Sequence, residues 1–199
     1  MPSRLAPKLR RGFLRTASGH LKAIRANVSN KLPHLANAMN LPSHQLTMTV
    51  LMTPDMANFA GNVHGGTILK FLDQVAYACA SRYASSYVVT MSVDQVTFRQ
   101  PIYVGELVSF LACVNYTGTS SMEIGIKVVA ENIRTQEMRH VNSCYFTMVA
   151  VDDARKPVAV PPLRPFSPEE KLRFEGAVLR KKLRQALEAQ FNAAKSPTA

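Results

Sequence analysis

The residues of this chain that could do chemistry are concentrated between positions 58 and 73, where a glycine-rich loop runs directly into an apolar helical pattern. Glycines let the backbone approach a ligand closely. A helix N-terminus carries free N–H groups and a partial positive charge, so Gly65 and Gly66 are candidate donors to an oxyanion or a carbonyl oxygen. Asp73 adds a carboxylate about two turns into the helix. Backbone donors and a nearby carboxylate are the parts that acyl transfer requires.

The same loop holds two asparagines and a histidine whose roles stay open. Asn58 and Asn62 could orient a water molecule or a substrate through their amides. They could equally shape the loop, because asparagine tolerates the left-handed conformation and forms Asx-turns. His64 invites a Ser–His or Cys–His interpretation, but no nucleophile is identifiably paired with it. Asp73 itself could be solvated or paired with Lys70, three residues earlier.

A second group of candidates lies further along the chain. It comprises the turn residues Gly118, Thr119, Ser120 and Ser121 and the basic residues Arg155 and Lys156. A backbone-rich turn suits a phosphate, and basic side chains can bind one. The alternatives are a purely structural turn and solvated surface charge.

Helices and strands must position these residues, and the hydrophobic pattern of the sequence predicts where those helices and strands lie. Residues 44–52 are β-rich and alternate at first, so a strand precedes the loop. From about residue 66 to residue 84, apolar positions recur at helical spacing around most of the circumference, which favours burial on most sides. Further strands are expected over residues 87–98, 107–116, 122–130 and 139–151, separated by turn residues or proline.

The order of these elements predicts an α+β fold. An antiparallel meander curled around one long helix satisfies it, because helix and sheet each bury an apolar face on the other. After a proline-rich exit, Ser167 as N-cap, Pro168 and two glutamates open a second helix, which docks on the globule or on a neighbouring subunit. We therefore divide the chain into a basic N-terminal extension (1–39), a central domain (40–165) and a C-terminal helix and tail (166–199).

The net charge of +11 is distributed unevenly. Residues 1–39 hold eight Lys and Arg residues and no acid, whereas residues 40–165 hold nine residues of each sign. The central domain is thus near neutral, which argues against nucleic acid as a specific partner. The extension is compatible with a transit peptide or a basic amphipathic arm, and we favour a loosely ordered extension.

Three widely spaced cysteines, Cys79, Cys113 and Cys144, lie in largely apolar settings. They are typical of reduced, buried thiols in a cytoplasmic protein, and no C-x-x-C spacing indicates a metal. No apolar run approaches the roughly 18–20 residues that span a bilayer, and no secretory signal pattern is present. We expect a cytoplasmic location.

Several of these residues, taken together, resemble the acyl-CoA hydrolase branch of the hotdog-fold thioesterases. The matching positions are Thr53, Pro54, Asp55, Asn58, residues 61–66, Leu72, Asp73 and residues 118–123. The resemblance covers roughly residues 44–165. It implies hydrolysis of acyl-CoA to a free fatty acid and coenzyme A, with no cofactor beyond the coenzyme A of the substrate. It also implies a homodimer whose two sheets join into one, often assembled into a trimer of dimers.

In that family the active sites lie between subunits, so the resemblance implies that Asp73 faces a loop asparagine of the other subunit. The family places this asparagine three residues before the first loop glycine, which matches Asn58 and leaves Asn62 as second choice. Contacts to coenzyme A are implied for residues 118–121, and His64 is kept as a substrate-binding candidate. Many members have arginine where this chain has Thr119, so no phosphate contact is implied for that side chain.

A mechanism and two rival functions follow. The thioester carbonyl is expected at the helix N-terminus, polarised by the N–H of Gly65 or Gly66, with Asp73 as general base or nucleophile. A hotdog dehydratase or hydratase would instead pair His64 with Asp73 for proton transfer. A non-catalytic protein that binds coenzyme A or nucleic acid would use the basic extension.

Overall fold

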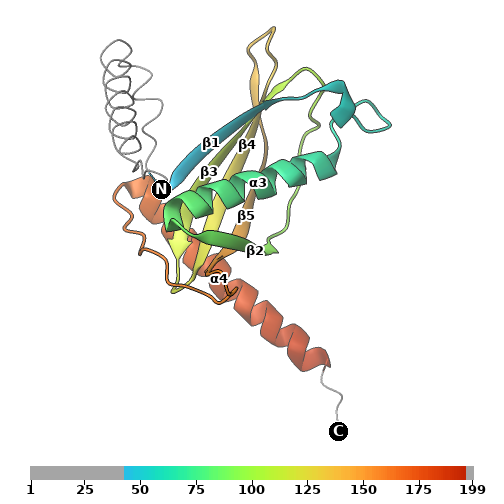
Figure 1. Cartoon of the computed structure of the whole chain (residues 1–199). Coiled ribbons are helices and arrows are strands. Elements are labelled where there is room, and N and C mark those ends of the chain that lie inside the picture. The colour runs from blue at the N-terminus through green and yellow to red at the C-terminus, as the bar shows by residue number, and fades with distance from the viewer. Residues whose placement is uncertain (1–42, 196–199) are drawn as a thin grey trace, which may run out of the picture. The chain divides into compact units, whose positions relative to one another are not determined.

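A five-stranded antiparallel sheet and two long helices form residues 43–195, the part of the chain that this computed structural model describes (Figure 1). Along the chain the elements are β1 (Gln45–Leu51), the short 3₁₀ helix η1 (Pro54–Met56), α3 (Gly65–Ala84), β2 (Tyr87–Val93), β3 (Leu107–Thr117), β4 (Ser121–Glu131), β5 (Met138–Val151) and α4 (Pro168–Lys195). The predicted order, one helix after the first strand and then four strands, is confirmed, as is the second helix. The extension assigned to residues 1–39 lies outside the described residues.

The strands of the sheet lie in the order β1-β3-β4-β5-β2, so β1 and β2 are its two edges. Edge strand β2 pairs with β5, and its register shifts between Thr90 and Ser92, which leaves Met91 as a bulge. The pattern predicted this strand through residue 98, and that end was wrong. The Asp94 N–H still donates to the Tyr145 carbonyl at 2.9 Å, but the Asp94 carboxylate accepts from Arg184 of α4 at 2.7 Å, and the chain then leaves the sheet.

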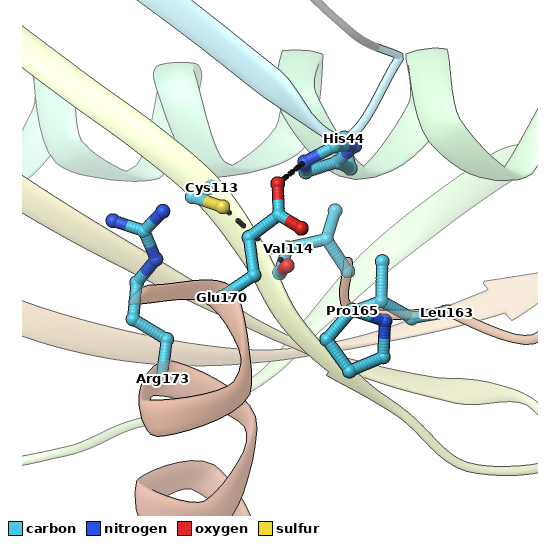
Figure 2. Close-up of a pocket in the computed structure, with 7 residues that line it drawn as sticks. All are labelled: His44, Cys113, Val114, Leu163, Pro165, Glu170 and Arg173. Atoms are coloured by element: carbon cyan, nitrogen blue, oxygen red, sulfur yellow. Dashed lines mark hydrogen bonds and ion pairs between the residues drawn. The ribbon is translucent and has the colours of Figure 1, made fainter. Parts of the chain in front are cut away.

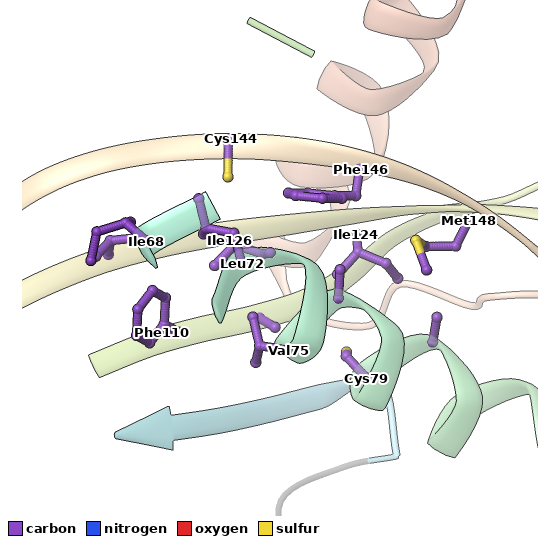
Figure 3. Packing of buried hydrophobic residues seen from close by; sticks show 14 of the residues in the cluster. Ile68, Leu72, Val75, Cys79, Phe110, Ile124, Ile126, Cys144, Phe146 and Met148 are labelled. Carbon is purple, nitrogen blue, oxygen red and sulfur yellow. The ribbon is translucent and has the colours of Figure 1, made fainter. Parts of the chain in front are cut away.

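The core lies between α3 and one face of the sheet. Figure 3 shows side chains of α3 pointing toward side chains of the strands. The helix contributes Ile68, Leu72, Val75 and Cys79, and the strands contribute Phe110, Ile124, Ile126, Cys144, Phe146 and Met148. In the single chain this burial is one-sided, because Leu69 and Tyr77 on the other side of α3 each remain 41% exposed.

Helix α4 crosses the opposite face of the sheet (Figure 1) and is held there by charge. The carboxylate of Glu123 on β4 is only 2% exposed and accepts hydrogen bonds from Arg180 and Arg184. The Arg180 guanidinium also lies 3.6 Å from the centre of the Tyr145 ring. Of the two docking alternatives for this helix, the structure shows contact with its own globule.

The first turn of α4 is capped as predicted. The Glu170 N–H donates to Ser167 Oγ at 3.1 Å, and the Ser167 N–H donates back to the Glu170 carboxylate at 3.1 Å. The Phe166 N–H also donates to this carboxylate, and the two donors, Phe166 first and Ser167 second, lower the pKa of Glu170. Figure 2 shows the same carboxylate meeting His44 just before β1, with 3.1 Å between His44 Nε2 and Glu170 Oε1.

None of the helices within residues 43–195 is long and apolar enough to cross a membrane.

Candidate active site

The loop between η1 and α3 is closed at its base and shaped by Asn58. The Asn58 N–H donates to the Asn62 carbonyl at 2.6 Å. Asn58 Oδ1 accepts from the N–H groups of Ala60 and Asn62 at 2.8 and 3.2 Å, so this side chain shapes the loop as in an Asx-turn. Gly61 closes the loop with φ +80°, a conformation that favours glycine. Since Oδ1 is engaged, the amide NH₂ group of Asn58 is the part left for a ligand.

The start of α3 is capped by a side chain. His64 is the N-cap residue, and its Nδ1 accepts from the Gly66 N–H at 2.9 Å. This contact occupies the Gly66 donor and gives His64 a structural role. Within residues 43–195, the Gly65 N–H donates to no other group. Of the two predicted carbonyl donors, Gly65 is therefore the one available to a ligand.

Asp73 lies on the exposed side of α3 and is held by the edge strand. Its Oδ1 accepts a hydrogen bond of 2.7 Å from Thr90 Oγ1 on β2. The alternative ion pair with Lys70 is not formed among the described residues. Thr90 is a candidate site residue that its local sequence does not indicate, because a threonine among β-branched residues is ordinary in a strand.

The turn between β3 and β4 is fixed by hydrogen bonds that its carbonyl groups accept. The Thr119 carbonyl accepts from the Val160 N–H, and the Ser120 carbonyl accepts from the Ala150 N–H, each at 2.9 Å. A third hydrogen bond of 2.7 Å closes the turn from the Gly118 N–H to the Ser121 carbonyl.

Basic side chains from two segments, α4 and the loop after β5, lie near this end of the sheet. Lys181 Nζ of α4 would lie 3.6 Å from a Cβ placed on Gly118, a proximity that local sequence does not indicate. Arg155 adopts φ 63° and extends its guanidinium over the Tyr87 ring, with 5.9 Å to the ring centre. The Lys156 N–H donates to Asp152 Oδ1 at 2.8 Å, which fixes the backbone and leaves the ammonium group exposed.

The sheet register brings Asp73 near the β3–β4 turn. Thr90, which holds Asp73, pairs with Met148, and Met148 pairs with Met122 directly after the turn. Two strand spacings separate Thr90 from Met122, which is about 10 Å. Asp73, Thr90 and the turn therefore make up one half of a candidate site within a single chain.

The glycine loop is not part of that half. Gly65 precedes Asp73 by eight residues, which is about 12 Å along the helix axis. A carbonyl oxygen that accepts from Gly65 at about 3 Å must be attacked by a group about 3–3.5 Å from its carbon. Asp73 of the same chain is too far away to act there. The same separation prevents His64 and Asp73 of one chain from acting as the proton-transfer pair of a dehydratase.

An ion pair between Glu106 and Arg139 stabilises the segment that contacts the glycine loop. Glu106 accepts two hydrogen bonds from Arg139 and one from the Tyr103 N–H. Burial alone would raise the pKa of Glu106, but these donors outweigh burial and lower it. The segment that the pair fixes accepts from the glycine loop, since the Val63 N–H donates to the Ile102 carbonyl at 2.8 Å.

Two cavities in the described part of the chain lie away from the predicted residues. One, of about 10 Å³, lies at the first turn of α4 beside Cys113 (Figure 2), and it is large enough for one water molecule at most. The other, of about 520 Å³, lies between α4 and the outer sheet face, and its lining includes Leu111, Tyr145, Leu172 and Arg173. Neither is lined by a residue of the glycine loop or by Asp73.

The three cysteines are free thiols, and Cys79 and Cys144 are buried as expected, whereas Cys113 is only half-buried. Burial raises the pKa of Cys79 and of Cys144 to about 12 and that of Cys113 to about 11. The thiolate is the nucleophilic form of cysteine, so none of the three is prepared for covalent chemistry at neutral pH.

Comparisons with known proteins agree on one superfamily. The sequence profile of the thioesterase superfamily matches residues 60–137. Protein VdlD of Helicobacter pylori is 51% identical over 140 residues, which are 70% of this chain and 80% of that protein. The crystal structure of an apo-hexameric acyl-CoA thioesterase aligns with a TM-score of 0.71 and 36% identity, covering 73% of this chain and 93% of that one.

A third similar protein has been solved with ligands and as variants. It is the acyl-CoA hydrolase of Staphylococcus aureus, in complex with butyryl coenzyme A, coenzyme A and coenzyme A disulfide. It aligns with a TM-score of 0.70 and 30% identity, covering 75% of this chain and 92% of that one. Its alanine variants replace an asparagine, an aspartate 15 residues later and a threonine 17 residues after that.

Proposed function

The chain belongs to the thioesterase superfamily and has its hotdog fold, and on this premise we propose that it hydrolyses acyl-CoA at a site formed by two copies of the chain. The products are a free fatty acid and coenzyme A. Coenzyme A enters only as part of the substrate, and the proposal involves no further cofactor. The observation that carries it is the contact between Asp73 and Thr90 on the exposed side of α3.

Residue spacing supports the same assignment. In this chain Asp73 follows Asn58 by 15 residues and precedes Thr90 by 17. These are the spacings of the three substituted positions in the Staphylococcus aureus hydrolase. Asn62 does not fit this spacing, so we assign the loop role to Asn58.

The active unit we propose is a homodimer joined along β2 and the exposed side of α3. Strand β2 is a sheet edge, and Met91 and Val93 on it are 73% and 45% exposed. Leu69 and Tyr77 provide further uncovered apolar surface on α3. Pairing of two β2 strands would join the sheets and bring the two α3 helices together. Each glycine loop would then meet the partner's Asp73.

In the proposed mechanism the thioester carbonyl accepts from the Gly65 N–H of one chain while the partner's Asp73 acts on its carbon. Asp73 either removes a proton from water, which adds to the carbonyl, or adds to the carbonyl itself to form an anhydride that water then cleaves. In both routes one water is consumed, the C–S bond breaks and the thiolate leaves with a proton. Thr90 holds the carboxylate, and the Asn58 NH₂ group orients the substrate or the water.

We place coenzyme A against the chain that supplies Asp73, beside residues 118–121. The turn lies about 10 Å from Thr90 by strand spacing. The neighbouring cations Lys181, Arg155 and Lys156 are suited to its phosphate groups. The reaction is assigned to the cytoplasm because the cysteines of the chain are free thiols.

We further propose that the dimers assemble as a trimer, through α4. The outer side of this helix carries a row of large apolar side chains, each more than half exposed: Leu172, Leu179, Leu183, Leu187 and Phe191. At the start of this row, Leu172 also lines the cavity of about 520 Å³ between α4 and the outer sheet face. A row of exposed apolar side chains of this kind is typical of a protein contact. A solution mass at or below that of a dimer in analytical ultracentrifugation would contradict this assembly.

Thiol release is the direct test of the function. The purified full chain is incubated with acetyl-, butyryl-, octanoyl- and palmitoyl-CoA, and free thiol and free acid are measured together. Equal amounts of thiol and acid from at least one substrate are expected. Absence of thiol from every substrate, or a change in unsaturation without thiol, would contradict the proposal.

Thr90→Val is expected to lower kcat about tenfold with little change in KM. The substitution preserves the shape of the side chain but removes the donor to Asp73, and a hydrogen bond to a charged group contributes about 1.5–3 kcal/mol. Thr90→Ser, which restores the hydroxyl, is the matched control and should recover most of the rate. If Thr90→Val had the same kcat as the unchanged chain, Thr90 would not position the Asp73 carboxylate.

A further inference from the structure

Phe59 is an apolar side chain held away from the rest of its own chain. It lies at the tip of the glycine loop, which projects beyond the N-terminal end of α3 in Figure 1, and its side chain is fully exposed. The hydrogen bonds to Asn58 Oδ1 fix the backbone on both sides of the tip. A phenyl ring on a fixed, projecting loop is typical of a contact with another molecule.

A matching surface surrounds Asp73. Leu69, Asp73 and Tyr77 follow one another at four-residue intervals, so they share one side of α3. Leu69 and Tyr77 are both exposed, and the bulge on β2 places Met91 next to Thr90 with 73% of its surface exposed. Within residues 43–195, the carboxylate is thus flanked by large side chains that keep a substantial part of their apolar surface exposed.

We propose that Phe59 enters the partner subunit beside the partner's Asp73 and forms a side wall for the acyl chain of the substrate. The inference rests on the proposed function, in which Asn58 reaches the thioester at the partner's Asp73. Phe59 is the next residue, with its Cα about 3.8 Å away. Its ring therefore falls among Leu69, Tyr77 and Met91 of the partner's surface.

The acyl chain needs such a wall because it is apolar and begins at the carbonyl that Asn58 and Gly65 contact. Its first carbons must run past the residues next to Asn58. Packing against the ring removes apolar surface of both groups from water. The contribution grows with each methylene that reaches the ring, so Phe59 favours longer acyl chains over acetyl.

The test compares kcat/KM for acetyl-, butyryl-, hexanoyl- and octanoyl-CoA in Phe59→Ala, Phe59→Leu and the unchanged chain. Phe59→Ala is expected to reduce the octanoyl-to-acetyl ratio roughly tenfold, with a loss that increases with chain length. Phe59→Leu retains an apolar wall and should keep the ratio within about threefold. Phe166→Ala is the matched control, because Phe166 is also a highly exposed phenylalanine but precedes α4.

Each outcome has one meaning. A ratio in Phe59→Ala that equals or exceeds that of the unchanged chain overturns the inference. A loss of equal size for all four substrates also overturns it, because Phe59 would then only hold the dimer together. Dimer mass is measured for each variant by light scattering. The proposed function fails by a different result, namely no thiol release by the unchanged chain from any of the substrates.

Discussion

Asp73→Asn is expected to lower kcat for thiol release about 10³-fold. Removal of a general base costs about 10²–10⁴-fold, and a nucleophilic carboxylate has no substitute in an amide. The fold should persist, because asparagine keeps an oxygen that accepts from Thr90. KM should change little, since the proposed contacts to the carbonyl and to coenzyme A come from other residues. Single-turnover and steady-state thiol release on oligomeric protein measure both quantities.

Glu188→Gln provides the matched control for this result. Glu188 is likewise an exposed carboxylate on a helix, but it lies on α4, far along the chain from the proposed site. Its neutralisation should leave kcat as it is. An Asp73→Asn variant that retains more than about a tenth of the original rate would remove Asp73 from the chemistry.

Asn58→Asp and Asp73→Asn are expected to be inactive separately and active together when co-expressed. In a mixed dimer one site combines both substitutions, whereas the other combines an intact loop with an intact Asp73. Equal co-expression makes about half of the dimers mixed, so about a quarter of the original specific activity should return. Asn58→Asp suits this test because it keeps the oxygen that closes the loop and removes the NH₂ donor.

The control for complementation is a mixture of the two variants purified separately and assayed before subunits exchange. That mixture should stay inactive, although its composition equals that of the co-expressed sample. Co-expressed protein that is as inactive as its parents, yet shown by mass spectrometry to contain mixed dimers, would place each complete site within one chain.

The elements of the fold were largely predictable because each carries its own periodic signal. Ile68, Leu72 and Val75 mark α3 by helical spacing, and alternation marks β3 and β4. The end of β2 was not predictable in this way. Val96 and Phe98 continue the β-like composition, but Asp94 is drawn to Arg184, which lies 90 residues away along the chain. A local pattern does not contain that contact.

The residues of the proposed site also differ in whether the local sequence indicates them. Asn58, Gly65 and Asp73 are close in sequence, and their residue types and spacing indicated them. Thr90 meets Asp73 only because β2 lies beside α3 in the folded chain, so nothing in its sequence neighbourhood distinguished it from other strand threonines. Occupation of the Gly66 donor is local, by contrast, and a histidine two residues earlier is a signal that could have indicated it.

The separation of eight positions between Gly65 and Asp73 along α3 also has a consequence for mass action. If the site is shared as proposed, a correctly folded single chain holds every catalytic group and no complete site. Specific activity would then fall as the protein is diluted below the dissociation constant of the dimer, while the helical content stays constant. A higher level of gene expression would then raise the number of chains and also the fraction of them that are in active dimers.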